Sequence, residues 1–242
     1  MPAGNHQLRL PGKTMTKNSK PKWNEIFAAL KKWHEALCAS AGTADPSVST
    51  IAEHYRREPW AVLVSTILSL RTKDEVTLAA SKRLLEKAGD PAHLLAMKEQ
   101  RIAELIYPVG FYRTKAASLK KIAAILLEQY SGKVPASMND LLALPGVGRK
   151  TANLVLTEAF DLDGLCVDIH VHRISNRCGW LSSKNPEETE MILREILPKK
   201  YWKQINYFLV LYGQTLCRPV SPFCSRCDIR KYCTRCDVER SR

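Results

Sequence analysis

Apolar residues recur at helical spacing through most of this chain, and this periodicity limits the fold class more than any other feature. After Trp23, a helical face is marked at i, i+4, i+7 and i+11 by Ile26, Leu30, Trp33 and Leu37. We find no run in which apolar and polar residues alternate, as they do in a half-buried strand. The sequence therefore predicts an all-α fold.

Short breaking segments separate the helical runs and predict short connections between helices. Gly89-Asp90-Pro91 and Ser131-Gly132 both fall between apolar runs. Asn185 followed by Pro186, with an acid at Glu188, is typical of a helix N-terminus, since it combines a capping side chain, a first-turn proline and an acid at the third position. We see no tandem repeat and no low-complexity linker that would divide the chain cleanly.

The charge balance of the 242-residue chain indicates a polyanionic partner. Lys and Arg number 37 against 24 Asp and Glu, which gives a net charge of +13 and a pI of about 9.4. Nucleic acid is the first candidate for such a partner, with a merely solvated basic surface as the alternative. The longest apolar run, Trp60–Leu70, is well short of the roughly 20 residues that span a bilayer. We therefore expect a buried core helix there and no contact with a membrane.

The two ends of the chain lead to separate expectations. Residues 1–22 combine basic side chains with no acid and little apolar content, which predicts a flexible basic tail, and Met15 is an alternative start. The sequence opens with no apolar leader segment, so we expect a cytoplasmic protein. In that reducing compartment eight cysteines are not expected to form a disulfide framework.

Four cysteines near the C-terminus are spaced closely enough to share one metal centre. The pattern C-x6-C-x2-C-x5-C is formed by Cys217, Cys224, Cys227 and Cys233. Thiolates at such spacings bind zinc or an iron–sulfur cluster. Zinc sites usually pair two close knuckles, and this pattern has one, so the spacing favours a [4Fe–4S] cluster. Cys236 is not needed by the pattern, and three others are predicted as small core residues: Cys38, Cys166 and Cys178.

The segment LPGVGRK, Leu144–Lys150, joins two apolar helical runs. Gly146 and Gly148, on either side of Val147, permit backbone conformations closed to other residues and let a phosphate approach closely. The N–H groups of the turn and the positive end of the second helix would then face that phosphate. We therefore predict a helix-hairpin-helix at about residues 139–160 that grips a DNA backbone independently of sequence.

Lys150, which ends this segment, admits two interpretations. It either pairs with a DNA phosphate, which is the common role, or acts as a Schiff-base nucleophile, which requires a neutral amine. The positive end of the helix, partial burial and the neighbouring Arg149 would all favour the neutral form. Four carboxylates downstream are candidates to accept its proton, and the pattern alone does not choose among Glu158, Asp161, Asp163 and Asp168.

Three motifs in this order resemble a known family. LPGVGRKTANLVL is followed by VDIHVHRISNR at residues 167–177 and then by the four-cysteine pattern. Together they resemble endonuclease III, a DNA glycosylase and AP lyase of the helix-hairpin-helix superfamily, over about residues 25–235. The resemblance makes Lys150 the nucleophile and Asp168 the catalytic aspartate. It also makes the four cysteines the ligands of a structural [4Fe–4S] cluster.

The resemblance implies two helical lobes with DNA bound across the cleft between them. We expect a six-helix barrel at residues 52–162, and an iron–sulfur lobe built from residues 23–51 and 163–242. The implied partner is double-stranded DNA with a damaged base or an abasic site, bound by a monomer associated with the nucleoid. The candidate DNA contacts are Gly146, Val147, Gly148, Arg149, Arg71, Phe111, Arg173 and Arg218. For Arg173 an ion-pair network is an equal alternative.

Oxidised pyrimidine is the leading substrate class among those found in this superfamily. Adenine glycosylases that are similar to this chain carry a serine at the position of Lys150, and an early catalytic glutamate that Trp60–Leu70 lacks. Arg71 replaces the glutamine that endonuclease III usually places in the gap left by a flipped base. Phe111 aligns with an apolar wedge that is often leucine, with a plain core aromatic as the alternative. The alternatives are a monofunctional glycosylase for alkylated or mismatched bases and a non-catalytic, metal-stapled DNA-binding module.

Overall fold

The structure of the protein, a computed structural model, describes residues 20–41 and 46–242. Its helices are α1 (Trp23–Ala41), α2 (Ser47–His54), α3 (Pro59–Ser69), α4 (Asp74–Leu85), α5 (Pro91–Ala96), α6 (Glu99–Ile106), α7 (Tyr112–Tyr130), α8 (Met138–Ala143), α9 (Arg149–Phe160), α10 (Ile169–Cys178), α11 (Pro186–Ile196) and α12 (Trp202–Thr215), with short 3-10 helices η1 (Lys199–Tyr201), η2 (Cys224–Arg226) and η3 (Arg230–Tyr232). The described residues contain no strand, so the all-α prediction is confirmed. Most of the predicted basic tail, residues 1–19, lies outside the described residues.

Local sequence signals mark the helix boundaries as predicted. At the start of α11 the side chain of Asn185 accepts a hydrogen bond of 2.8 Å from the backbone N–H of Glu188, and Pro186 occupies the first turn. Helix α3 is buried from Trp60 to Leu68, which confirms the predicted core helix. Among the described helices, none has the length and apolar character needed to cross a bilayer.

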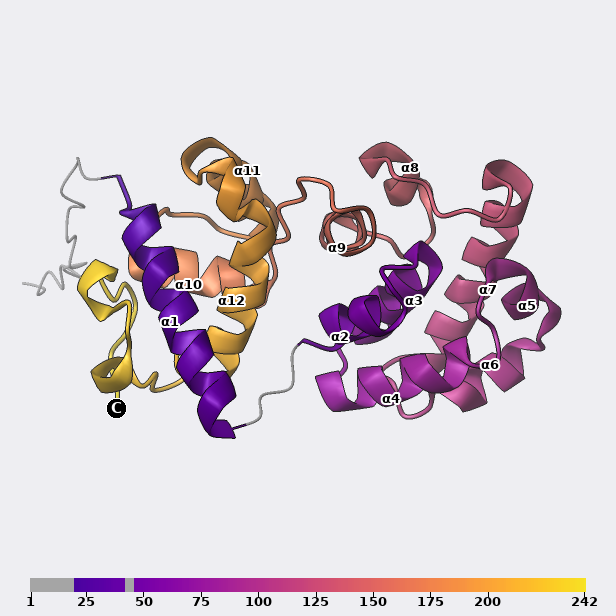
Figure 1. The fold of residues 1–242 in the computed structure, drawn as a ribbon, viewed down its shortest axis with the longest axis horizontal. Helices are drawn as coiled ribbons and strands as arrows, with labels where there is room; N and C mark the ends of the chain where they lie inside the picture. The colour runs from indigo at the N-terminus through magenta and orange to yellow at the C-terminus, as the bar shows by residue number, and fades with distance from the viewer. Residues whose placement is uncertain (1–19, 42–45) are drawn as a thin grey trace, which may run out of the picture.

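The helices form two lobes, each with its own hydrophobic core (Figure 1). In the first lobe, α1, α10, α11 and α12 pack around Ile26, Leu30, Ile174 and Tyr212, and the C-terminal segment lies against them. The second lobe consists of α2 to α9, which surround the other core. Its helices of eight or more residues are α2, α3, α4, α6, α7 and α9. Helix α9 lies at the boundary between the lobes.

The chain passes from the first lobe to the second and later returns. We propose that the first of these two boundaries falls before α2, and not after residue 51 as the sequence suggested. Val48 and Ile51 are buried in the core of the second lobe, so the whole of α2 belongs there. The chain returns to the first lobe just after α9. There Cys166 still packs in the second core, whereas Leu165 and Val167 pack in the first.

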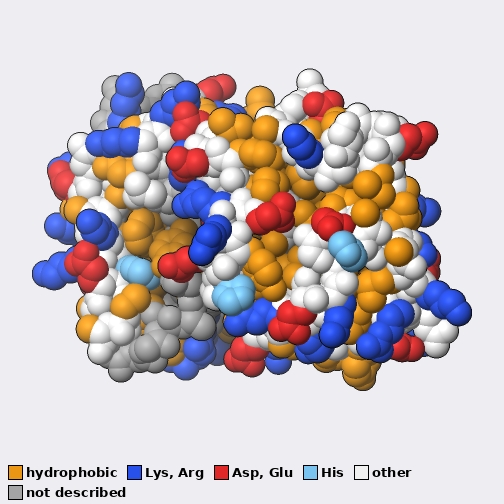
Figure 2. Space-filling model, turned by 45° about the vertical axis from the view of Figure 1, so that its right-hand side comes forward, with side chains coloured by type: hydrophobic (Ala, Val, Ile, Leu, Met, Phe, Trp, Pro, Cys, Tyr) orange, Lys and Arg blue, Asp and Glu red, His pale blue; other side chains and the backbone are white. Residues whose placement is uncertain are grey.

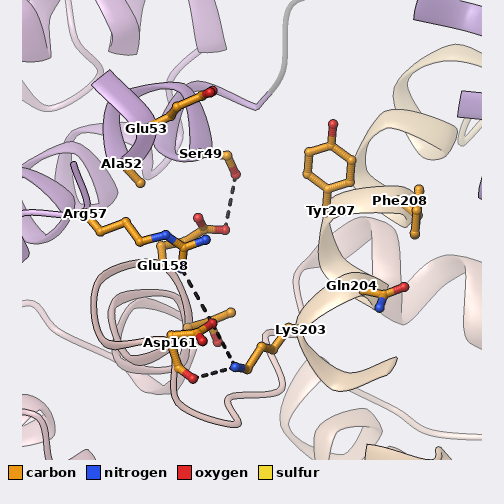
Figure 3. Close-up of a pocket in the computed structure, with 11 residues that line it drawn as sticks. Ser49, Ala52, Glu53, Arg57, Glu158, Asp161, Lys203, Gln204, Tyr207 and Phe208 are labelled. Atoms are coloured by element: carbon orange, nitrogen blue, oxygen red, sulfur yellow. Dashed lines mark hydrogen bonds and ion pairs between the residues drawn. The ribbon is translucent and has the colours of Figure 1, made fainter. Parts of the chain in front are cut away.

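Polar side chains join the lobes near the C-terminal end of α9, around a cavity of about 470 Å³ (Figure 3). Arg57 of the second lobe and Lys203 of α12 both reach the carboxylate of Asp161, at 3.6 and 2.9 Å. Close by, the hydroxyl of Ser49 donates to Glu158 at 3.2 Å. Burial raises the pKa of Glu158. Of these contacts, the pair of Lys203 and Asp161 links α12 to the end of α9 and so joins the two lobes.

Candidate active site

A cleft of about 460 Å³ lies between the lobes, where the N-terminal ends of α9 and α10 meet. Lys150 projects from the first turn of α9, and Asp168 caps α10 from the other lobe. The Nζ of Lys150 lies 3.8 Å from Oδ2 of Asp168. The lysine side chain is 41% exposed and the aspartate 7% exposed, so a DNA atom can reach the amine while the carboxylate stays sheltered. Of the four carboxylates left open by the sequence, Asp168 is the one that Lys150 reaches.

The two carboxylate oxygens of Asp168 have different partners. Its Oδ1 accepts hydrogen bonds from the backbone N–H groups of His170 at 2.8 Å and Val171 at 2.9 Å, which is an N-cap on α10. The cap fixes the side chain, so that Oδ2 points toward Lys150. A distance of 3.8 Å is too long for a direct hydrogen bond but short enough for strong charge attraction.

The hairpin between α8 and α9 has the glycine-specific backbone that the sequence predicted at Gly146, but not at Gly148. Gly146 adopts φ +79°, in the left-handed region that favours glycine. Val147 is buried in the core, and its N–H donates to the carbonyl of Leu144 at 3.1 Å, so its side chain is an anchor of the turn. Gly148 has an ordinary φ of −96°, and a Cβ added there would meet no atom within 4 Å. The surface at Gly148 is therefore open.

Arg149 does not have the environment expected of a phosphate contact. Its Nε and Nη2 both donate to the carboxylate of Glu190 on α11, at 3.1 and 2.7 Å. Glu190 is buried, and also accepts from Asn153 and Arg194. Burial alone would raise the pKa of Glu190, but the hydrogen bonds from Arg149, Arg194 and Asn153 outweigh it and lower the pKa. Arg149 is thus held across the lobe boundary, where its charge is compensated.

Replacing Glu190 with alanine is expected to destabilise the protein by about 1–3 kcal/mol, because the partly exposed guanidinium groups of Arg149 and Arg194 lose their buried carboxylate partner. Thermal or urea unfolding measures the change, with the exposed Glu195→Ala on the same helix as the matched control. Since the pKa of Glu190 lies below its ordinary value of 4.5, the contribution is full above that pH and is lost as the pH falls below it. Equal stability of the two variants would contradict this role.

Arg71 and Phe111 lie together at the tips of two loops, as a pair of DNA contacts requires. The guanidinium carbon of Arg71 is 5.5 Å from the centre of the Phe111 ring, within the range of a cation–π contact. Both side chains are exposed, Phe111 to 62%. Because Phe111 is this exposed, it is not the core aromatic that the sequence left as an alternative.

The two other arginines predicted to contact DNA differ in their environment. Arg173 is turned into the protein, where its Nη2 donates to the carbonyls of Gly213 at 3.2 Å and Cys217 at 3.0 Å. The predicted phosphate contact of Arg173 is therefore not supported, because its guanidinium holds the start of the cysteine-containing segment. Arg218 is exposed, with its guanidinium over the ring of Phe223, and stays a candidate.

The four cysteines of the pattern line one small cavity in the first lobe, bordered by α10, α12 and the C-terminal segment. All four are free thiols of intermediate burial. Arg177 donates to the sulfur of Cys217 at 3.4 Å, and Tyr212 donates to that of Cys227 at 3.3 Å. Within the described ranges, no three His, Cys, Asp or Glu side chains converge closely enough for a single metal ion. The four thiols thus lie around one shared cavity, and Cys178 also lines it.

The face in Figure 2 shows basic and acidic side chains interspersed over its surface. The net charge of +13 therefore does not form one continuous basic field on that face.

Comparison with known families agrees with this geometry. Residues 64–199 match the family described as HhH-GPD superfamily base excision DNA repair protein. Endonuclease III of Thermotoga maritima is 47% identical over 179 residues, which cover 74% of this chain and 84% of that protein. Endonuclease III homolog 2 of Arabidopsis thaliana is 42% identical over 86% of this chain, but the match spans 56% of that longer protein.

Solved structures show the same fold. A non-covalent endonuclease III–DNA complex aligns with a TM-score of 0.75 and 30% identity, covering 88% of this chain and 95% of that one. A trapped covalent endonuclease III–DNA intermediate aligns with a TM-score of 0.71 and 29% identity over the same shares. The fold and site thus define a helix-hairpin-helix base excision repair enzyme. Within this class, the chain belongs to the endonuclease III family, whose members are DNA glycosylases with AP lyase activity.

Two buried charged residues near the site were missed from the sequence. Glu190 looks like one of several acids on an amphipathic helix, and Lys115 looks like one of several lysines on α7. Both are buried. The available signal was their spacing, since each falls on the apolar face of its helix. Ile169, beside Asp168, is 67% exposed in the cleft, and nothing within the chain explains that exposure.

Proposed function

We propose that this protein excises oxidised pyrimidines from double-stranded DNA and cleaves the resulting abasic site through a Schiff base on Lys150. The observation that carries the proposal is the approach of Lys150 to Asp168 across the lobe boundary, at 3.8 Å in an open cleft. A nucleophile beside a sheltered carboxylate is the arrangement that covalent base excision requires. Neither the monofunctional glycosylase nor the DNA-binding module is favoured by the comparisons.

The reaction begins when the damaged nucleotide leaves the stack and enters the cleft. The neutral amine of Lys150 attacks C1′ of the deoxyribose, forming an N–C bond as the glycosidic bond to the base breaks. Asp168 stabilises the positive charge that develops on the sugar, and accepts a proton from the attacking amine. The sugar ring opens to a Schiff base, β-elimination breaks the strand on the 3′ side, and water then hydrolyses the Schiff base to free Lys150.

The open surface at Gly148 supports DNA binding by the hairpin. Gly146 is required by its own left-handed backbone, but Gly148 is required neither by its φ nor by any neighbouring atom. A glycine with open space before a helix N-terminus leaves room for a phosphate. With Arg149 held by Glu190, the grip on phosphate comes from backbone N–H groups, and Arg71, Phe111 and Arg218 supply the exposed side chains.

A panel of duplexes tests the lesion class. Each carries one thymine glycol, 5-hydroxycytosine, 8-oxoguanine or 3-methyladenine, and base release and strand cleavage are measured separately. We expect both products from the two oxidised pyrimidines and little from the others. Base release without cleavage would identify a monofunctional enzyme, and tight binding without either product would identify a DNA-binding module.

The fit of the cysteine-lined cavity supports a [4Fe–4S] cluster in this chain, held by Cys217, Cys224, Cys227 and Cys233. Such a cluster would supply structural cross-links and no step of the reaction. It would fix the C-terminal segment, which adds few residues to the core of the first lobe.

Cys227→Ala is expected to lose iron and the visible absorption of the cluster, and to melt earlier than the parent protein. Cys236→Ala is the matched control, since Cys236 is exposed and outside the pattern. Iron and sulfide analysis of both variants measures the effect. Stoichiometric zinc in the parent protein, or loss of iron from the control alone, would contradict the assignment.

The site is complete within one chain, which supports action as a monomer. Lys150, Asp168 and the hairpin all come from the same polypeptide, and both lobes contribute to the cleft. Since the proposed substrate is genomic DNA, we expect the protein to work at the nucleoid.

A further inference from the structure

Lys115, in the first turns of α7, is a buried cation that the reaction described above does not use. Its side chain is 7% exposed. The ammonium group donates to the carbonyls of Leu68 at 2.8 Å and Leu70 at 2.5 Å, and to the hydroxyl of Thr72 at 3.2 Å. Three protons thus have three acceptors, all at the end of α3 or in the loop that follows it.

This loop and the loop before α7 are joined directly at the ammonium group. The hydroxyl of Thr72, which accepts from Lys115, also accepts from the backbone N–H of Gly110 at 3.1 Å. The loops are in such close contact that a Cβ on Gly110 would lie 2.6 Å from the carbonyl oxygen of Arg71. A side chain at Gly110 would therefore collide with the backbone of the other loop, and the two loops pack directly against each other.

Each loop carries one exposed tip residue in a strained backbone conformation. Arg71 has φ +54° and Phe111 has φ +57°, both in the left-handed region that is unfavourable for these residues. Such conformations persist when their surroundings enforce them. The hydrogen bonds of Lys115 to the carbonyls and hydroxyl on both sides of Arg71 supply that enforcement.

A buried ammonium is costly, and an apolar side chain would cap the core at lower cost. Burial lowers the pKa of Lys115 to about 8, so at neutral pH the charged form, with its full set of donors, still predominates. The chain accepts this cost at a position from which one cation reaches Leu68, Leu70 and Thr72 together. This placement indicates a role in fixing the loops beyond filling the core.

We propose that Lys115 is a positioning residue that locks Arg71 and Phe111 into a single rigid prong, which fills the space left in duplex DNA when the damaged nucleotide is flipped out. The proposal rests on the proposed function for the flipping step. The prong is preassembled, because the guanidinium of Arg71 already stacks on the ring of Phe111. A rigid prong replaces lost base stacking without first being ordered.

The proposal is tested by comparing one abasic site in two settings. In a duplex the prong must fill a gap opposite an unpaired base, whereas in a single strand no such gap exists. Lys115→Met should slow cleavage of the duplex site by about 10- to 100-fold, the cost of misplacing positioning groups by an ångström or less. Cleavage of the single-stranded site should fall far less. Lys120→Met is the matched control, because Lys120 is on the same helix and donates to a backbone carbonyl, that of Met97, away from both loops.

A second readout separates this proposal from the proposed function. A duplex with an unreactive tetrahydrofuran abasic analogue and 2-aminopurine opposite it reports insertion of the prong as a rise in fluorescence, whether or not cleavage occurs. Lys115→Met and Arg71→Ala/Phe111→Ala should both reduce the rise, and combining them should add little. Equal losses on duplex and single strand, or an unchanged fluorescence rise, would overturn the proposal. Should Lys115→Met not fold, Thr72→Val, which removes the hydroxyl shared with Gly110, carries the same prediction.

Discussion

Lys150→Ala is expected to abolish strand cleavage at an abasic site, with a loss of about three orders of magnitude or more, as seen when a covalent nucleophile is removed. In the proposed mechanism the amine forms the bond to C1′, and among the described residues that line the cleft no other amine lies at the same place. Lys203 also lines the cleft, but its amine is paired with Asp161. The rate is measured on a duplex with a preformed abasic site, so that base excision does not limit it.

Lys31→Ala, which removes an exposed lysine of α1 outside the cleft, is the control for this variant and should cleave within a few-fold of the parent rate. Because Lys150 is 41% exposed at a helix N-terminus, its loss should leave the fold intact. Binding to a tetrahydrofuran duplex should also change little, since the hairpin supplies backbone contacts. Full cleavage by Lys150→Ala would show that another amine is the nucleophile. Loss of binding together with cleavage would make Lys150 a phosphate contact.

Asp168→Asn is expected to lower base excision by about 10²- to 10⁴-fold while leaving stability nearly unchanged. Asparagine caps helices as well as aspartate does, so its carbonyl can still accept from the N–H groups of His170 and Val171. What the variant lacks is the negative charge 3.8 Å from Lys150. In the proposed mechanism this charge stabilises the cationic sugar and takes a proton from the amine.

The measurement for Asp168→Asn is the single-turnover release of thymine glycol, with thermal melting in parallel. Asp163→Asn serves as the control, because Asp163 is exposed and paired with Lys199 at 3.0 Å, away from the cleft. A variant that melts several degrees earlier would show that the charge matters for the fold as well. Unchanged base release would remove Asp168 from the chemistry.

Features that depend on neighbouring residues in the sequence were predictable. The cap at Asn185, the core helix around Trp60–Leu68 and the left-handed turn at Gly146 each follow from local conformational preferences. The pairing of Lys150 with Asp168 was among four options from the residues, and the family resemblance selected it. The structure brings these two side chains together from different lobes.

Features that depend on partners distant in sequence were not predictable. Arg149 and Arg173 both looked like phosphate contacts, because a basic side chain beside a DNA-binding motif is usually exposed. In the folded chain Glu190, 41 residues away, binds Arg149, and the carbonyls of Gly213 and Cys217 bind Arg173. Cys38 was expected in the core but is exposed. Its position on α1 was judged by residue type alone, without the packing of that helix.

Locating the covalent bond tests directly whether Lys150 is the nucleophile. The parent protein is mixed with a duplex carrying one thymine glycol, borohydride is added, and the trapped complex is digested and sequenced by mass spectrometry. We predict a sugar adduct on the peptide containing LPGVGRK, at Lys150. An adduct on a different lysine, or base release with no adduct at all, would contradict the assignment of Lys150 as the nucleophile.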